Sequence, residues 1–147
     1  MKKILPPTYL FINFLLLLVL HYFLPIIQII PQTYSYIGAG FLLFGLTINY
    51  QADSLFKKHK TTVKPHEKPT SLITAWPFSL SRHPMYLGFL SILLGLAIFL
   101  GSLSSFFPVI FLFYILQTQF IPHEEKNLEE VFETKYKEYK KKVRKWL

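Results

Sequence analysis

Residues 83–123 read HPMYLGFLSILLGLAIFLGSLSSFFPVIFLFYILQTQFIPH and contain no Asp, Glu, Lys or Arg. Residues 4–52 form a second uncharged stretch of the same kind. Each stretch is long enough for two crossings of a bilayer at about 20 residues per helix. A helix packed on a soluble core would carry a polar stripe at every third or fourth position, and neither stretch does. The sequence therefore predicts an all-α integral membrane protein.

The composition excludes several other classes of protein. Of the 147 residues, 52% are hydrophobic and only 16% are charged. The chain has no cysteine, which excludes disulfides, thiolate nucleophiles and cysteine zinc sites. No two histidines have the spacing of metal ligands, so we expect no metal. The net charge of +8 adjoins the apolar stretches. We interpret it as attraction to a lipid bilayer with anionic headgroups and expect no nucleic-acid partner.

The two uncharged stretches divide into four predicted spans at turns that contain Pro, Gly or Ser. The spans cover residues 9–30, 34–50, 84–100 and 106–121. The first includes an extension past Pro25 to Ile30. A loop, residues 51–83, joins the second span to the third, and a helix is predicted at 124–147. We treat the whole chain, residues 1–147, as a single membrane domain.

The positions of the basic residues predict the topology. All 16 Lys and Arg lie in the first three residues, in residues 51–82 or in residues 126–145. Four crossings place these regions on one side of the bilayer, which the positive-inside rule makes the cytoplasmic side. Three or five crossings would leave one basic region outside. We therefore expect a multi-pass protein with both termini and its active site facing the cytoplasm.

The C-terminal segment has the periodicity of an amphipathic helix. Its apolar residues recur at steps of three and four: Leu128, Val131, Phe132, Tyr136, Tyr139, Val143 and Trp146. Acidic residues come first and basic residues last, as the helix dipole favours. We predict a cytoplasmic helix that lies on the membrane or over the bundle. The run Lys140-Lys141-Lys142 is expected to face lipid headgroups, and Trp146 is expected to be an interfacial anchor.

Two polar motifs stand where the predicted spans meet the cytoplasm. Ser81-Arg82-His83-Pro84-Met85-Tyr86-Leu87-Gly88 begins the third span, and His123-Glu124-Glu125 follows the fourth. A short turn joins these spans, so they should be antiparallel neighbours, and the two motifs should face one pocket. Each motif alone is ordinary, as a basic flank before a helix-starting Pro or as acids in a first turn. Together at neighbouring helix ends they favour a functional site.

Residues 72–147 resemble the C-terminal half of the isoprenylcysteine carboxyl methyltransferase and phospholipid methyltransferase group. The resemblance rests on the first motif, on Glu124-Glu125, and on Leu128, Phe132, Tyr136, Tyr139 and Val143-Arg144. It implies a membrane-embedded methyltransferase that uses S-adenosylmethionine and takes a lipophilic small molecule from the bilayer. The group often has Gly at the positions of Trp76 and Glu133, where this chain departs from it.

The resemblance also implies roles for individual residues. The implied cofactor-binding residues are His83, Pro84, Tyr86, Leu87, Gly88, Glu124, Glu125 and Tyr136. The implied catalytic residues are Arg82 and Glu125, with Arg82 near the carboxylate or phosphate of the substrate. We favour a carboxylate acceptor like that of an isoprenylcysteine, because it is already ionised at pH 7 and needs no general base. An Arg side chain can orient such a group through two hydrogen bonds.

Two other functions stay open on the sequence. Membrane sterol reductases carry a loosely similar C-terminal region, so an NADPH-dependent reductase is one alternative. The other is a non-enzymatic scaffold whose basic tail binds anionic lipid.

Overall fold

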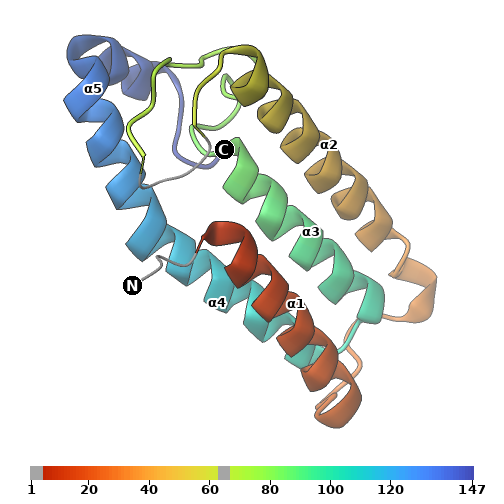
Figure 1. Ribbon diagram of the computed structural model, residues 1–147. Helices are drawn as coiled ribbons and strands as arrows, with labels where there is room; N and C mark the ends of the chain where they lie inside the picture. The colour runs from red at the N-terminus through yellow and green to blue at the C-terminus, as the bar shows by residue number, and fades with distance from the viewer. Residues whose placement is uncertain (1–4, 63–66) are drawn as a thin grey trace.

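The computed structural model describes residues 5–62 and 67–147. These residues are helical and turn-forming, and within them no β-strand forms beyond a single bridge between Gln28 and Ser102. The main helices are α1 (Pro6–Phe23), α2 (Ile37–Lys58), α3 (Pro84–Leu100), α4 (Phe107–Ile115) and α5 (Ile121–Lys142). Helices α1, α3 and α4 contact one another in pairs, and α2 packs along α3 (Figure 1). The predicted all-α class is confirmed for the described residues.

Helix α3 has the bounds that the sequence predicts, but the first two spans need correction. Helix α1 ends at Phe23 and does not continue to Ile30. Pro25 has no N–H to donate and disfavours a helical conformation in the residue before it, so the helix ends there. Helix α2 begins at Ile37 and extends beyond the predicted residue 50 to Lys58.

The helix of the fourth predicted span does not end at Pro122. Helix α4, a π-helical turn (Leu116–Phe120) and α5 follow one another without interruption, and Pro122 lies in the first turn of α5. A helix can pass a proline where its regular hydrogen bonding is already interrupted, and the π turn is such an interruption. The predicted end of the fourth helix at residue 121 is therefore wrong, while the end of the membrane span stays a prediction.

Helix α5 folds back on itself at Glu133. This residue has a φ of 42° and a ψ of −113°, inside an otherwise helical segment. Glu129 and Lys140 would be about 16 Å apart along a straight helix, yet their side chains form an ion pair of 2.7 Å. Figure 1 shows the resulting turn in α5. The predicted single helix over residues 124–147 is thus two arms, and it ends at Lys142.

The apolar surface is that of a membrane protein. Helix α1 and the continuous helix over Leu103–Lys142 are long and apolar enough to cross a bilayer, and α3 is apolar but shorter. The outward faces expose large side chains, including Phe11 (60%), Leu43 (66%) and Ile110 (64%). Such patches are rare on soluble monomers. Four crossings and a cytoplasmic orientation of the site stay predictions.

Close packing of α2 on α3 fixes the start of α3 in the bundle. A Cβ atom at Gly45 would lie 2.6 Å from the carbonyl oxygen of Gly88, and one at Gly88 would meet the amide of Asn49. Only glycine allows the two backbones to approach this closely. The contact positions the residues that precede and begin α3, which carry the first motif.

Candidate active site

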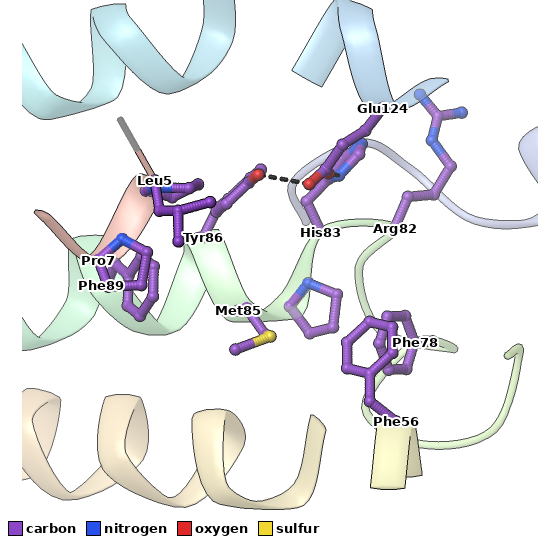
Figure 2. Close-up of a pocket in the computed structure, with 12 residues that line it drawn as sticks. Leu5, Pro7, Phe56, Phe78, Arg82, His83, Met85, Tyr86, Phe89 and Glu124 are labelled. Atoms are coloured by element: carbon purple, nitrogen blue, oxygen red, sulfur yellow. Dashed lines mark hydrogen bonds and ion pairs between the residues drawn. The ribbon is translucent and has the colours of Figure 1, made fainter. Parts of the chain in front are cut away.

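The start of α3 and the start of α5 meet at one end of the bundle. His83, which precedes α3, is buried. Its Nδ1 lies 3.1 Å from Glu124 Oε2, and its Nε2 lies 3.4 Å from Glu125 Oε1. The hydroxyl of Tyr86 donates to the other oxygen of Glu124, and Figure 2 shows these two side chains pointing toward each other beside His83. The structure thus brings the two motifs together.

Arg82 is the main positive charge of the site. Its Nη2 lies 2.7 Å from Glu125 Oε1, and its side chain is only 9% exposed. Its Nη1 makes longer hydrogen bonds to the carbonyl oxygens of Lys140, at 3.4 Å, and Val143, at 3.5 Å. A buried charge is tolerated when it is paired and hydrogen-bonded in this way. Arg82 and Glu125 therefore hold each other in place.

Lys140 is a second cation at the charged site, and its presence there was not predicted from the sequence. Its Nζ lies 2.7 Å from Glu129 and 3.6 Å from Glu125, and 5.7 Å from the centre of the Tyr136 ring. We expected Lys140 to face headgroups together with the next two lysines. That prediction is wrong for Lys140, because the turn at Glu133 carries it back to the site.

The ion pairs shift the titration of two side chains that lie outside the predicted spans. Burial opposes the charged form of His83, but hydrogen bonds and charge from Glu124 and Glu125 outweigh it and raise its pKa above the ordinary value. Burial would raise the pKa of Glu125, yet its contact with His83 and the charges of Arg82 and Lys140 lower it to about 2. At neutral pH Glu125 is therefore an anion.

Two cavities adjoin this charged cluster and share part of their walls. The shared residues are Phe56, Phe78, Arg82, His83 and Glu124. The first cavity, of about 220 Å³, is mostly apolar and is further lined by Leu5, Pro6, Pro7, Pro84, Met85, Tyr86 and Phe89 (Figure 2). The second, of about 100 Å³, is further lined by Thr62, Glu67, Pro69, Ser71, Leu72, Ile73, Asn127, Leu128 and Tyr139. The charged cluster thus separates an apolar space from a more polar one.

Two buried polar atoms among the residues of the charged site keep hydrogen-bonding capacity. Within the part of the chain that the structure describes, neither Arg82 Nε nor the Tyr136 hydroxyl contacts a hydrogen-bond partner. Tyr136 is fully buried, and its pKa is raised by burial and by the nearby charge of Glu125. Buried polar atoms are normally paired with protein or with water. Arg82 lines both cavities, so its Nε is suited to bind a molecule or a water there, whereas Tyr136 lines neither cavity.

Two of the predicted site residues, and Trp76, where the chain departs from the resembling group, lie away from the cavities. Leu87 and Gly88 line neither cavity, and Gly88 faces α2. Trp76 is half exposed and donates a hydrogen bond to Gln51, so it fills no part of the site. The proposed roles of the other motif residues stay predictions.

Several residues that line the two cavities were not predicted from the sequence. The walls formed by Phe56, Phe78 and the segment 67–73 come from the end of α2 and from the loop before α3. Nothing in the local sequence around these residues differs from that of an ordinary helix end or loop. Their role depends on where the loop crosses the bundle.

Two comparisons with known proteins bear on this site. A family model described as phospholipid methyltransferase matches residues 34–135, which include both motifs. A protein of Haemophilus influenzae, described as uncharacterized, is 40% identical over 63 residues, which are 43% of this chain and the full length of that protein. The family match ends just before Tyr136, so Lys140 and the end of the chain lie beyond it.

Proposed function

Because the chain belongs to the phospholipid methyltransferase family, we propose that it transfers a methyl group from S-adenosylmethionine to a lipophilic substrate that the bilayer delivers. The observation that carries this proposal is the charged cluster of Arg82, His83 and Glu124 in the wall between an apolar and a more polar cavity. Such a wall suits a lipid on one side and a polar cofactor on the other. Family membership also favours methyl transfer over reduction or scaffolding.

The more polar cavity has the side chains that S-adenosylmethionine requires. Glu67, which already accepts a hydrogen bond from Thr62, and Asn127 line it with polar side chains of the kind that bind ribose hydroxyls. Leu72 and Leu128 offer apolar surface to the adenine ring. The carboxylate of Glu124 in the shared wall would offset the positive charge of a sulfonium. The donor and acceptor set therefore fits this cofactor.

The apolar cavity suits the acceptor. When bound, the cofactor supplies a methyl group on a sulfonium, whose sulfur keeps the bonding electrons as an acceptor oxygen bonds the methyl carbon. A carboxylate acceptor loses its negative charge in that step while the sulfonium loses its positive charge. An apolar surrounding favours the loss of both charges, because charges are poorly solvated there. Arg82 has Nε available to orient the carboxylate.

Glu125 and His83 act on Arg82 and Glu124 by holding them in position. Glu125 contacts both Arg82 and His83, and His83 also contacts Glu124. Methyl transfer depends mainly on alignment of the acceptor with the methyl group, since no proton needs to move for a carboxylate. The ion-pair network supplies a rigid frame for that alignment.

A lipid amine is a second candidate acceptor. Glu124 lines both cavities, and its two oxygens contact Tyr86 and His83. A carboxylate in this position can bind an ammonium group and accept its proton, which leaves the nitrogen lone pair free to bond the methyl carbon. The two candidates are separated by offering labelled S-adenosylmethionine with either N-acetyl-farnesylcysteine or vesicles of phosphatidylethanolamine. We expect label in the farnesylcysteine ester, and label in the phospholipid alone would contradict the carboxylate assignment.

Cofactor binding is tested by calorimetry on the purified protein in detergent with S-adenosylmethionine, because its sulfonium carries the charge that Glu124 would offset. We expect the wild type to bind and Glu124→Gln to bind at least about tenfold more weakly, the loss that follows from removing one charge-assisted contact. Glu130→Gln is the matched control, because Glu130 lies on the same helix but is exposed and lines neither cavity. Failure of the wild type to bind, or equal loss in both variants, would contradict the proposal.

A further inference from the structure

The last residues of the chain fold back across the first motif and form a segment, residues 143–147, that we call the C-terminal strap. The backbone N–H of Arg82 donates to the carbonyl oxygen of Arg144 at 3.0 Å. The hydroxyl of Ser81 donates to the carbonyl oxygen of Lys145, also at 3.0 Å. The strap therefore holds the backbone at Arg82 in place.

The strap also reaches the side chains of the site. Arg82 Nη1 contacts the carbonyl oxygen of Val143, the first residue of the strap. The hydroxyl of Ser81 that donates to the strap also accepts the backbone N–H of His83 at 3.2 Å. Strap, arginine and histidine thus form one hydrogen-bonded unit.

Trp146 fastens this strap to the membrane bundle. Its Nε1 donates to Gln117 Oε1 at 2.9 Å, and its ring centre lies 5.2 Å from that of Phe113. Phe113 and Gln117 are about one turn apart on the same helix and so present a joint surface. Gln117 stands in an apolar helix, at its π-helical turn. A polar amide among apolar groups gains from a dedicated partner, and Trp146 is that partner.

We propose that Trp146 is a positioning residue for methyl transfer, which fixes Arg82 by docking the strap on Gln117 and Phe113. The kinetic part of this proposal rests on the proposed function, whereas the docking itself does not. The guanidinium has one short ion pair, to Glu125, and two long bonds to carbonyl oxygens at the end of α5 and the start of the strap. Release of the strap would leave Arg82 free to turn about its contact with Glu125.

Hydrogen exchange on the full chain in detergent tests the docking without any assay of activity. Arg82 should be protected in the wild type, because its N–H is bonded to the strap. Trp146→Ala should speed exchange at Arg82 at least about tenfold while amides within α3 stay protected, as in a local opening. Leu147→Ala is the control, because this neighbour is 63% exposed. Unchanged exchange at Arg82 in Trp146→Ala would overturn the proposal.

Kinetics then test the consequence for the site. Trp146→Ala should raise KM for the acceptor about tenfold, since a displacement of about 1 Å in a positioning group is costly. Its affinity for S-adenosylhomocysteine should stay within about twofold of wild type. Trp146→Phe keeps an aromatic ring but loses the N–H, so its KM should lie between those of Trp146→Ala and wild type.

Two further outcomes separate this inference from the proposed function. If Trp146→Ala accelerates exchange throughout the protein, Trp146 is a general anchor and its positioning role is wrong. If Arg82 alone is released but the wild type transfers no methyl group, the docking is supported and the proposed function is wrong.

Discussion

The two ends of α3 both carry polar clusters, but the clusters differ in charge. At the C-terminal end, His21 Nδ1 lies 2.9 Å from the hydroxyl of Ser102, which also lies 2.7 Å from the hydroxyl of Ser105. Gln28 donates to a backbone carbonyl beside them, at Leu100. At the N-terminal end, Arg82, His83 and two glutamates form ion pairs. One end is a network of amide, hydroxyl and imidazole groups, and the other is built on ionised side chains.

The difference favours the charged cluster, and not the cluster at Ser102, as the functional one. The cluster at Ser102 bonds to the backbone and side chains that close the loop between helices, and the cavities described above do not touch it. The cluster at Arg82 borders two cavities, and among the described residues Arg82 Nε has no partner. A cluster whose polar groups bond to one another and to the nearby backbone stabilises the fold. A cluster with unused donors beside a cavity is prepared for a ligand.

The largest expected effect is on activity at the charged end. Glu125→Gln should lower kcat/KM for methyl transfer about 100-fold or more, a loss typical of removing one preorganised electrostatic group. Both Arg82 and His83 lose an ionised partner in this variant. Initial rates of label transfer provide the measurement. Ser102→Ala, at the opposite end, should keep kcat/KM within about threefold, and an equal loss in both variants would remove the distinction between the ends.

The opposite end should instead control stability. Ser102→Ala should lower the free energy of unfolding by about 1–3 kcal/mol, because His21 and Ser105 lose a buried partner. Reversible unfolding in mixed detergent micelles measures the change. Ser79→Ala is the control, since Ser79 is exposed, and it should leave stability unchanged. A stable Ser102→Ala protein would show that this cluster is not structural.

A smaller effect is expected at the turn that brings Lys140 to the site. Glu133 has a positive φ of 42°, a conformation that costs a residue with a Cβ about 1–3 kcal/mol. Glu133→Gly should therefore stabilise the protein by about 1 kcal/mol, with a corresponding rise in Tm. Glu138→Gly, in a regular and exposed part of the same helix, should destabilise it by about 1 kcal/mol. Destabilisation by both variants would contradict the strained turn.

This turn also marks what the sequence could not predict. The apolar steps of three and four continue from Leu128 to Tyr139 across Glu133, although within these steps only Tyr136 and Tyr139, in the second arm, are buried. Periodicity reports the faces of a helix and does not report a change in its direction. The one available sign of the turn was the glycine that the methyltransferase group often has at the position of Glu133.

The bounds of α3 could be predicted because both ends carry local signals. Pro84 occupies the first turn, where its missing N–H costs nothing, and Gly101 follows the last residue with a φ of 73°. The contact of His83 with Glu124 also followed from local information, since a short turn makes α3 and the next helix neighbours. The cavity wall at residues 67–73 did not, because it depends on a long loop returning to the bundle.

The smallest expected effect is a shift in the titration of His83, which sharpens the difference in charge between the ends. The raised pKa of His83 means that its protonated form is stabilised on folding. Its contribution to stability is therefore complete below about pH 6.5, the pKa of the unfolded state, and is lost as the pH rises through the higher folded value.

NMR titration of His83 should give a pKa above 6.5 in the wild type and a lower one in Glu124→Gln. Glu129→Gln, whose side chain pairs with Lys140 and not with His83, should leave it unchanged. A wild-type pKa at or below 6.5 would mean that burial outweighs the two carboxylates and that His83 is neutral in the folded site.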